Sequence, residues 1–499
     1  MMAKTKLCAT VVGKTITELR RLRDSQFGAD LVELRLDSLD EPDVAAALSG
    51  RNVPVIATCR PVWEGGFFSG SEDERRDLLL EAQRLGAEYI DVEYRSGFVD
   101  RLVERSGGSG IVVSYHDFER TPVGLAGIYR NMRQTGAEVV KIATQVDSLC
   151  QGLELMSLGT SEEARVLIGM GPAGIPTRVL ANHFGVSWSY AGNGVAPGQI
   201  DLKQMLDRYR FSELTSQTEI YGVIGKPVMH SVSPAMHNAG FRELKSNAVY
   251  LPLAAKNVED FFGFHRLIPV CGVSVTAPYK SAVQKYCLTR DGVSQAVGAV
   301  NTLKKDGKGW IGSNTDVTGF LAPISQRVSM RNLRCAVLGA GGAARAVVWG
   351  LSRDGGKVTC YARNINKGTA LSESLGVDIL PIPPENDSWD LLVNATPVGT
   401  FPNVEETPLP KYRFDGRYVY DLVYNPASTR LLRDAKSFGC DTIGGLEMLA
   451  NQAVQQFKSW TGVDVSIDLF LDAARNDLEQ RNREEDAVAS AKGTNGYDV

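Results

Sequence analysis

Short apolar runs rich in β-branched residues recur through the first 200 residues and alternate with amphipathic stretches. They return at intervals of roughly 20–35 residues, the pattern of strands that alternate with helices. The amphipathic stretches include Ser71–Leu85 and Val123–Gln134. Eight strands in such an alternation favour a (β/α)8 barrel over a doubly wound sheet. The predicted strands are Leu7–Val12, Leu31–Leu36, Val53–Cys59, Tyr89–Tyr94, Ile111–Tyr115, Val139–Thr144, Val166–Met170 and Val186–Tyr190.

The pattern changes after residue 206, where the segment DRYRFSELTSQT (207–218) is short and polar. A second series of strands and helices begins at 219–224, and a strand near 331–337 runs into a glycine-rich turn. We therefore predict an α/β protein with a barrel followed by a second α/β region that contains a nucleotide-binding subdomain.

Composition and charge exclude several classes of protein. A net charge of −4 argues against a surface for nucleic acid or anionic membranes. The eight cysteines are scattered, with no metal-binding spacing, so we expect no metal site and a reducing compartment. No apolar run reaches the roughly 18 residues of a membrane span, and no signal peptide is visible. We predict a cytoplasmic monomer or homodimer that acts on small molecules.

Charged and polar side chains interrupt the apolar pattern where the predicted barrel strands end. Lys141 lies inside one apolar run, and His116 follows another. Each such residue alone is more typical of a snorkelling or ion-paired side chain than of a catalytic group. Together they favour an active site, because barrel interiors are normally Val, Ile and Leu and barrel enzymes place their chemistry at the carboxyl ends of the strands. The candidates are Glu33, Arg35, Arg60, Glu93, His116 and Lys141.

A lysine in this setting predicts chemistry through an imine. Burial and positive neighbours lower the pKa of a lysine, and the neutral amine attacks a ketone. The protonated imine acidifies the adjacent carbon, and His116 is suited to remove that proton and later to protonate a leaving hydroxyl. We expect Glu93 to orient His116. Arg35, Arg60 and Arg178 offer forks for a substrate carboxylate or hydroxyls.

The segments around these residues, over roughly 5–205, resemble those of the type I 3-dehydroquinate dehydratases. The resemblance implies that Lys141 forms the Schiff base, that His116 is the general acid and base and that Glu93 is its partner. Val195 stands where many members have Ser, which predicts the loss of a substrate hydrogen bond. The matching segments are VELRLD (32–37), TCR (58–60), DVEY (91–94), SYHDF (114–118), VKIAT (140–144), GMGPAGIPTR (169–178) and APGQ (196–199). The residues implied to hold substrate are Glu33, Arg35, Arg60, Arg178 and Gln199.

A glycine-rich turn marks the second candidate site. The strand 335–338 runs into GAGGAA, a GxGxxA turn that lets the backbone approach a pyrophosphate at a helix N-terminus. About 20 residues further on, where an NAD enzyme usually presents Asp or Glu, the chain has Arg363 and Lys367, which suit the 2′-phosphate of NADP. The predicted cofactor-binding residues of this region are Gly339, Ala340, Gly341, Gly342, Ala343, Ala362, Arg363, Asn364 and Lys367.

Other short segments of the second half resemble the shikimate dehydrogenases, over roughly 219–475. The resemblance implies that Lys280 and Asp316 are the catalytic pair, with Lys280 donating a proton as hydride reaches a ketone. A cationic lysine beside a carboxylate suits this role, because it stabilises a developing alkoxide. Tyr279 and Ser274 stand where many members have His and Asn, which predicts altered specificity. The segments are GKP (225–227), HSVSP (230–234), SVTAPYK (274–280), GAVNT (298–302), NTD (314–316), NAT (394–396), DLVYNP (421–426) and GLEM (445–448). The implied substrate-binding residues are Ser231, Ser233, Thr276, Asn301, Tyr424 and Gln452, and Thr396 and Gly445 join the cofactor-binding set.

The two resemblances in this order are similar to the plant-type fusion of the two enzymes. They imply a barrel (1–210), a linker (211–218) and a two-lobed unit made of a substrate-binding lobe (219–325, completed by 450–475) and a Rossmann lobe (326–449), and we expect a disordered tail (476–499). They imply a shikimate-pathway enzyme that dehydrates 3-dehydroquinate to 3-dehydroshikimate and reduces the latter to shikimate with NADPH. Two alternatives remain at this point. One is a dehydrogenase that oxidises quinate and shikimate in a catabolic role, and the other is a non-catalytic, ligand-sensing regulator with the same folds.

Overall fold

The computed structural model describes residues 4–192 and 198–493, without the side chains of 367–370 and 484–493. The chain divides into two compact units, Met1–Met229 with Asn247–Val270, and His230–Ser246 with Cys271–Val499. This division differs from the predicted boundary at 211–218. That segment is a packed connection, because Phe211 and Leu214 are buried and Arg210 donates to the carbonyl oxygen of Ala248 at 2.7 Å.

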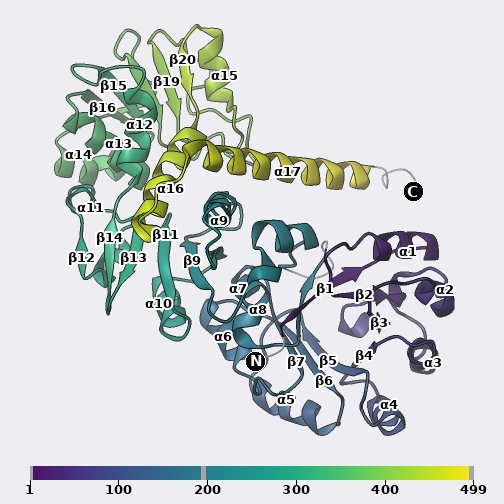
Figure 1. Ribbon diagram of the computed structural model, residues 1–499. Helices are drawn as coiled ribbons and strands as arrows, with labels where there is room; N and C mark the ends of the chain where they lie inside the picture. Colours follow the sequence, from purple (N-terminus) through teal and green to yellow (C-terminus); the bar gives the residue numbers. More distant parts are fainter. Residues whose placement is uncertain (1–3, 193–197, 494–499) are drawn as a thin grey trace. The chain divides into compact units, whose positions relative to one another are not determined.

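The first eight strands form a parallel sheet that curls into a nearly closed barrel (Figure 1). The sheet order is β7-β6-β5-β4-β3-β2-β1-β8, and Ser187 N–H donates to the Arg165 carbonyl oxygen at 2.8 Å where its ends meet. The strands are β1 (Lys6–Val11), β2 (Leu31–Arg35), β3 (Val55–Thr58), β4 (Tyr89–Glu93), β5 (Ile111–Asp117), β6 (Val139–Gln145), β7 (Arg165–Met170) and β8 (Trp188–Ala191). The predicted barrel is confirmed, with every strand close to its predicted range.

Helices follow the strands around the outside of the barrel (Figure 1). The longest begins at a capping box, in which the Ser71 hydroxyl accepts from Glu74 N–H and the Glu74 carboxylate accepts from Ser71 N–H. The helices are α1 (Ile16–Asp24), α2 (Val44–Leu48), α3 (Glu72–Arg84), α4 (Val99–Ser106), α5 (Leu125–Gln134), α6 (Leu149–Met156), α7 (Ile175–Val179) and α8 (Ala181–Phe184). Short helical turns at Gln204–Arg208 and Phe211–Glu213 follow β8.

The first unit also contains two strands and a helix from beyond residue 218. Strands β9 (Glu219–Ile224) and β10 (Ala248–Leu253) pair in parallel, and helix α10 (Val258–Leu267) packs against α6. The Asp260 carboxylate of α10 accepts hydrogen bonds from the first N–H groups of α6, those of Leu149 and Cys150, each at 3.0 Å. This carboxylate therefore ties α10 to the barrel.

The second unit contains a small mixed sheet with its own helices. Strand β11 (Val270–Val275) pairs antiparallel with β13 (Thr302–Asp306), which pairs antiparallel with β14 (Gly309–Ser313), and β12 (Thr289–Arg290) joins β14 in parallel. The helices of this part are α9 (Ser233–Glu243), α11 (Gly292–Val297) and α12 (Asp316–Ser325). Asp316, a predicted catalytic residue, is thus the first residue of α12.

A parallel sheet of six strands completes the second unit. Its order is β17-β16-β15-β18-β19-β20, the strand order of a dinucleotide-binding sheet. The strands are β15 (Arg334–Leu338), β16 (Lys357–Ala362), β17 (Asp378–Pro381), β18 (Leu391–Asn394), β19 (Tyr418–Asp421) and β20 (Asp441–Ile443), with helices α13 (Gly342–Arg353), α14 (Thr369–Leu375), α15 (Arg430–Ser437) and α16 (Gly445–Thr461). The predicted Rossmann sheet is confirmed.

The last helix, α17 (Ile467–Gly493), overturns one prediction. A disordered tail was expected from residue 476, yet the helix continues through that point. Its reason is an apolar stripe at helical spacing, Phe470, Ala474 and Leu478, all of which are buried. The charged composition of the last 20 residues concealed this stripe.

We predict that Asp260→Ala destabilises the first unit by about 1–3 kcal/mol, because it leaves buried N–H groups at the start of α6 without an acceptor. Denaturant unfolding of the full chain measures this as a lower midpoint for the first unit. Glu154→Ala, an exposed position on α6, is the matched control. Equal midpoints for Asp260→Ala and the wild-type protein would contradict the proposed tie.

Candidate active sites

The Lys141 amine lies inside the barrel, with only 4% of the residue exposed. Its Nζ lies 3.0 Å from Glu33 Oε1, 2.9 Å from Asp91 Oδ2 and 3.0 Å from the Tyr190 hydroxyl. The expected positive neighbours are therefore not its direct contacts: two carboxylates face the amine. A charged amine is buried at acceptable cost only when it is paired in this way.

Asp91 contacts both Lys141 and Arg60, which follows strand β3. Arg60 lies 3.0 Å from Asp91 Oδ1 and 2.7 Å from Glu93 Oε1. The Ser114 hydroxyl donates to Asp91 Oδ1 at 2.6 Å. Burial alone would raise the pKa of Asp91, but the charges of Arg60 and Lys141 outweigh burial and hold this pKa well below its ordinary value. Asp91 therefore stays ionised between two cations.

His116 contacts Glu64 rather than Glu93. Its Nδ1 lies 3.0 Å from Glu64 Oε1, and the same oxygen accepts from the His116 backbone N–H at 2.9 Å. Glu93 instead contacts Arg60 and Arg75. The prediction that Glu93 orients His116 is therefore wrong, because Glu93 lies deeper in the barrel and is held by two guanidinium groups.

The protonation states of the His116–Glu64 pair follow from their surroundings. Burial, together with the charges of Arg60 and Lys141, lowers the pKa of His116 well below its usual value. Burial raises the pKa of Glu64 to about 7, although the charge of Arg60 acts in the opposite direction. The imidazole is consequently a free base at neutral pH, able to accept a proton.

These residues line one pocket, together with the other predicted substrate-binding residues. Arg35 lines it while forming a two-point ion pair with Asp37. Arg178 is buried, its Nε has no hydrogen-bond partner among the described residues, and burial lowers its pKa to about 10. A buried guanidinium without a carboxylate is suited to a carboxylate ligand. The lining comprises Thr10, Glu33, Arg35, Arg60, Glu64, Gly65, His116, Phe118, Lys141, Ala143, Ile168, Met170, Arg178, Tyr190 and Gln199. Val195 lies outside the described residues.

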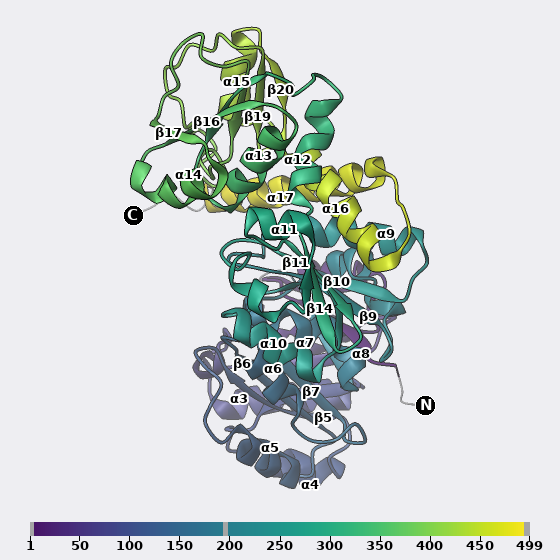
Figure 2. The same ribbon diagram turned by 90° about the vertical axis from the view of Figure 1, so that its left-hand side faces the viewer.

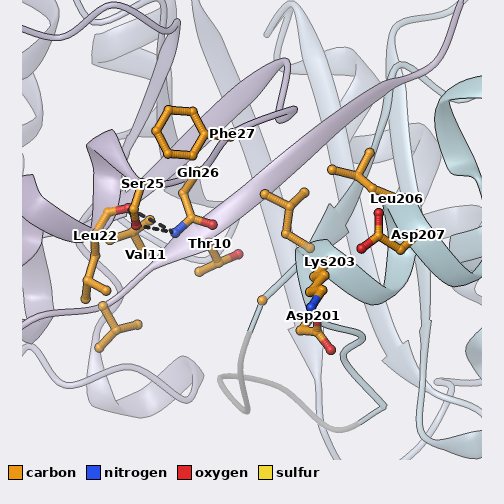
Figure 3. Close-up of a pocket in the computed structure, with 13 residues that line it drawn as sticks. Thr10, Val11, Leu22, Ser25, Gln26, Phe27, Asp201, Lys203, Leu206 and Asp207 are labelled. Atoms are coloured by element: carbon orange, nitrogen blue, oxygen red, sulfur yellow. Dashed lines mark hydrogen bonds between the residues drawn. The ribbon is translucent and has the colours of Figure 1, made fainter. Parts of the chain in front are cut away.

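A larger cavity of about 460 Å³ lies elsewhere on the barrel (Figure 3). It is lined by the end of β1, by the turn after α1 and by residues 201–207. Thr10 is the one residue that its lining shares with the lysine pocket. No predicted catalytic residue lines it, so size alone does not identify the reactive site.

The second site is built around Lys280 and Asp316. Lys280 Nζ lies 2.6 Å from Asp316 Oδ2, and Asn301 Nδ2 donates to Asp316 Oδ1 at 2.8 Å. Thr315 N–H donates to Asn301 Oδ1 at 2.8 Å, which fixes the orientation of the amide. The Asp316 carboxylate is thereby held on one side by an amide and faces the amine on the other.

The other predicted substrate-binding residues belong to the same unit, and one of them touches this centre. Gln452 Oε1 lies 3.4 Å from Asn301 Nδ2, and Ser231 Oγ accepts from Ser233 N–H at 3.2 Å. Ser231, Thr276 and Tyr424 are partly exposed, as residues that meet a ligand must be. Behind them, the Ser274 hydroxyl donates to Gln456 Oε1 at 2.7 Å, and Gln456 Nε2 donates to the Asn301 carbonyl oxygen at 3.1 Å. Tyr279 is buried.

The dinucleotide turn has the geometry that its sequence predicts. Gly339 has φ +114°, which favours glycine. Gly341 precedes α13 without a side-chain cap, and a Cβ placed there would meet nothing within 4 Å. Arg363 and Asn364 are exposed after β16, and the side chain of Lys367 lies outside the described residues. Gly445 is buried against the carbonyl oxygen of Leu422 and begins α16.

Three family models match the chain. They are type I 3-dehydroquinase over 7–216, the shikimate dehydrogenase substrate binding domain over 223–303, and the shikimate 5′-dehydrogenase C-terminal domain over 445–475. The bifunctional 3-dehydroquinate dehydratase/shikimate dehydrogenase, chloroplastic, of Arabidopsis thaliana is 35% identical over 505 residues, covering 93% of this chain and 83% of the plant protein. The chain belongs to this bifunctional family.

Single-function relatives of the second half of this bifunctional chain agree. The shikimate dehydrogenase (NADP(+)) of Trichormus variabilis is 36% identical over 292 residues, covering 54% of this chain and 98% of its own. A solved shikimate dehydrogenase in complex with NADP+ superimposes with a TM-score of 0.50 at 34% identity, covering 53% of this chain and 97% of its own. The predicted family and fold class are confirmed.

Sequence reasoning missed two important residues of the first site. Asp91 lies two positions before Glu93 on β4, so both face the barrel interior, and the same spacing had identified Glu33 and Arg35. Glu64 lies in a turn four residues after Arg60, away from any strand. The alternation of inward and outward side chains along β4 could have identified Asp91. Glu64 could not be identified in this way, because it reaches His116 only through the path of the turn.

We predict that Glu64→Gln flattens the pH dependence of stability. Folding raises the pKa of the Glu64 carboxyl from about 4.3 to about 7. Such a group stabilises the folded state fully below pH 4.3, and this stabilisation is lost as the pH rises through 7. Stability should therefore fall between pH 5 and 8 by about 2–3 kcal/mol less in Glu64→Gln than in the wild-type protein.

Denaturant unfolding at both pH values measures this difference, with the exposed Glu119→Gln as control. Equal pH dependence in the Glu64→Gln and wild-type proteins would show that Glu64 titrates normally.

Proposed function

We propose that the two sites catalyse consecutive steps, with the roles given to individual residues below. The first step is the dehydration of 3-dehydroquinate to 3-dehydroshikimate, and the second is the NADPH-dependent reduction of 3-dehydroshikimate to shikimate. The observation that carries the proposal is the buried Lys141 amine, which shares its pocket with a base, His116, and with Arg178, whose guanidinium pairs with no carboxylate among the described residues.

In the first site, the Lys141 amine attacks the substrate ketone after losing a proton, and water leaves to give an imine. His116, a free base, takes a proton from the carbon next to the imine. The electron pair flows toward the imine, and the hydroxyl on the following carbon leaves with a proton returned by His116. Glu64 positions the imidazole, and Arg178 binds the substrate carboxylate. Hydrolysis then frees Lys141.

In the second site, Lys280 donates a proton to the substrate ketone oxygen as the carbonyl carbon is reduced. Asp316 orients the amine, and Asn301 holds Asp316. Ser231, Ser233, Thr276, Tyr424 and Gln452 bind the ring substituents and the acid group. Reversal of these steps oxidises shikimate.

The residues at the Rossmann turn fit NADP(H), which supplies the hydride when bound. The open space at Gly341 and the uncapped start of α13 suit a pyrophosphate, and Arg363 suits the 2′-phosphate. No group of three or more His, Cys, Asp or Glu side chains among the described residues could hold a metal ion.

We also propose that the protein works in the cytoplasm as a monomer or homodimer. All eight cysteines are free thiols, which supports a reducing compartment. Among the described helices, none has the length and apolar character needed to cross a membrane.

We predict that Lys141→Ala and Lys280→Ala separate the two activities. Lys141→Ala should lose at least about 10³-fold in dehydration because no imine can form, while the reduction of added 3-dehydroshikimate is unchanged. Lys280→Ala should show the reverse. Dehydration is followed by product absorbance and reduction by NADPH consumption in the full-length protein. Loss of both activities in either variant would contradict the assignment of one amine to each site.

We predict that shikimate with NADP is the preferred pair for oxidation, over quinate with NAD. Arg363→Ala should raise the KM for NADP about tenfold and leave the KM for NAD within about twofold, because only NADP carries the 2′-phosphate. Steady-state oxidation of both acids with both cofactors measures this. A preference for quinate with NAD would instead support the quinate-oxidising alternative.

A further inference from the structure

Helix α17 extends beyond the region that the family models match, because the match to the C-terminal domain ends at residue 475. Helix α17 packs against α9 (Figure 2). The ring of Phe470 on α17 lies 5.5 Å from the ring of His237 on α9, measured between ring centres. Leu478, beyond residue 475, is buried on the same apolar stripe as Phe470, and α9 begins at Ser233.

Arg481, on the added part of α17, reaches the loop before α9. Its Nη2 donates to the Ser231 carbonyl oxygen at 3.0 Å and lies 2.6 Å from Asp477 Oδ2, one helical turn earlier. The Arg481 side chain is 17% exposed and that of Asp477 is 2% exposed. Asp477 thus fixes the guanidinium. Among the described residues, Nε and Nη1 of Arg481 have no hydrogen-bond partner.

Arg481 lies close to two predicted substrate-binding residues. Besides its hydrogen bond to Ser231, it acts electrostatically on Tyr424: burial raises the pKa of Tyr424, and the positive charge of Arg481 opposes that rise. The guanidinium is therefore part of the electrostatic surroundings of the second site, although its position lies outside every segment that identified the site.

The substrate of the second site is an anion, and the residues predicted to bind it are neutral. The one cation among them and the catalytic pair is Lys280, which is already 2.6 Å from Asp316. Resting on the function proposed above, we propose that Arg481 determines specificity for the acid. Its Nη1 group, which has no hydrogen-bond partner among the described residues, donates to the substrate carboxylate, while Nη2 holds the Ser231 loop in place.

The test compares shikimate with its uncharged methyl ester, each oxidised with NADP by the full-length protein. Arg481→Met should lower kcat/KM for shikimate about 10- to 100-fold, mainly through KM, and change that for the ester by less than about threefold. The KM for NADP and the dehydratase activity should not change. Arg481→Gln keeps a donor for the Ser231 carbonyl oxygen. It should nevertheless lose as much of the preference in kcat/KM for shikimate over the ester as Arg481→Met does.

Arg483→Gln is the matched control, because its side chain is 79% exposed on the same helix. If the ratio of kcat/KM for shikimate to kcat/KM for the ester were unchanged in Arg481→Gln, the proposal would be overturned. An equal loss of kcat/KM for both substrates would also overturn it, because that result indicates a structural role. If the wild-type protein oxidised no shikimate, the proposed function itself would fail, and that result is distinct from both.

Discussion

An amine paired with carboxylate is the interaction on which both sites depend, fully buried at Lys141 and partly buried at Lys280. Placing a charged amine in a protein interior is costly, and a pair that offsets this cost rarely adds stability over apolar packing. Lys141 between Glu33 and Asp91, and Lys280 against Asp316, are therefore better explained by chemistry than by folding. In the barrel the position of the amine depends on further residues, because Arg60 and Ser114 hold the Asp91 carboxylate in place.

The two folds place these amines in different ways. In the barrel, parallel register aligns Lys141 with Ser114 on β5, so that groups from neighbouring strands meet at one level of the interior. In the second unit, Lys280 lies in the segment after β11 while Asp316 begins α12. The two contact each other directly, and the Asn301 amide donates to Asp316. In the proposed reactions, the first amine forms a covalent bond to a ketone, whereas the second donates a proton.

Much of this arrangement could be predicted from the sequence, for physical reasons. Strand periodicity and polar interruptions predicted the barrel, and the glycine-rich turn predicted the Rossmann sheet. The partner of His116 could not be predicted in this way, because Glu64 reaches it from a turn whose path depends on tertiary packing. The extension of α17 was missed for another reason, since three apolar residues at helical spacing are easily outweighed by the charged residues between them.

Covalent attachment of Lys141 to the substrate can be tested by borohydride trapping. The full-length protein is incubated with 3-dehydroquinate and borohydride, digested, and analysed by mass spectrometry. We expect a reduced adduct on the peptide that contains Lys141, and only when the substrate is present. The absence of an adduct in a protein that still dehydrates the substrate, or an adduct on another lysine, would contradict it.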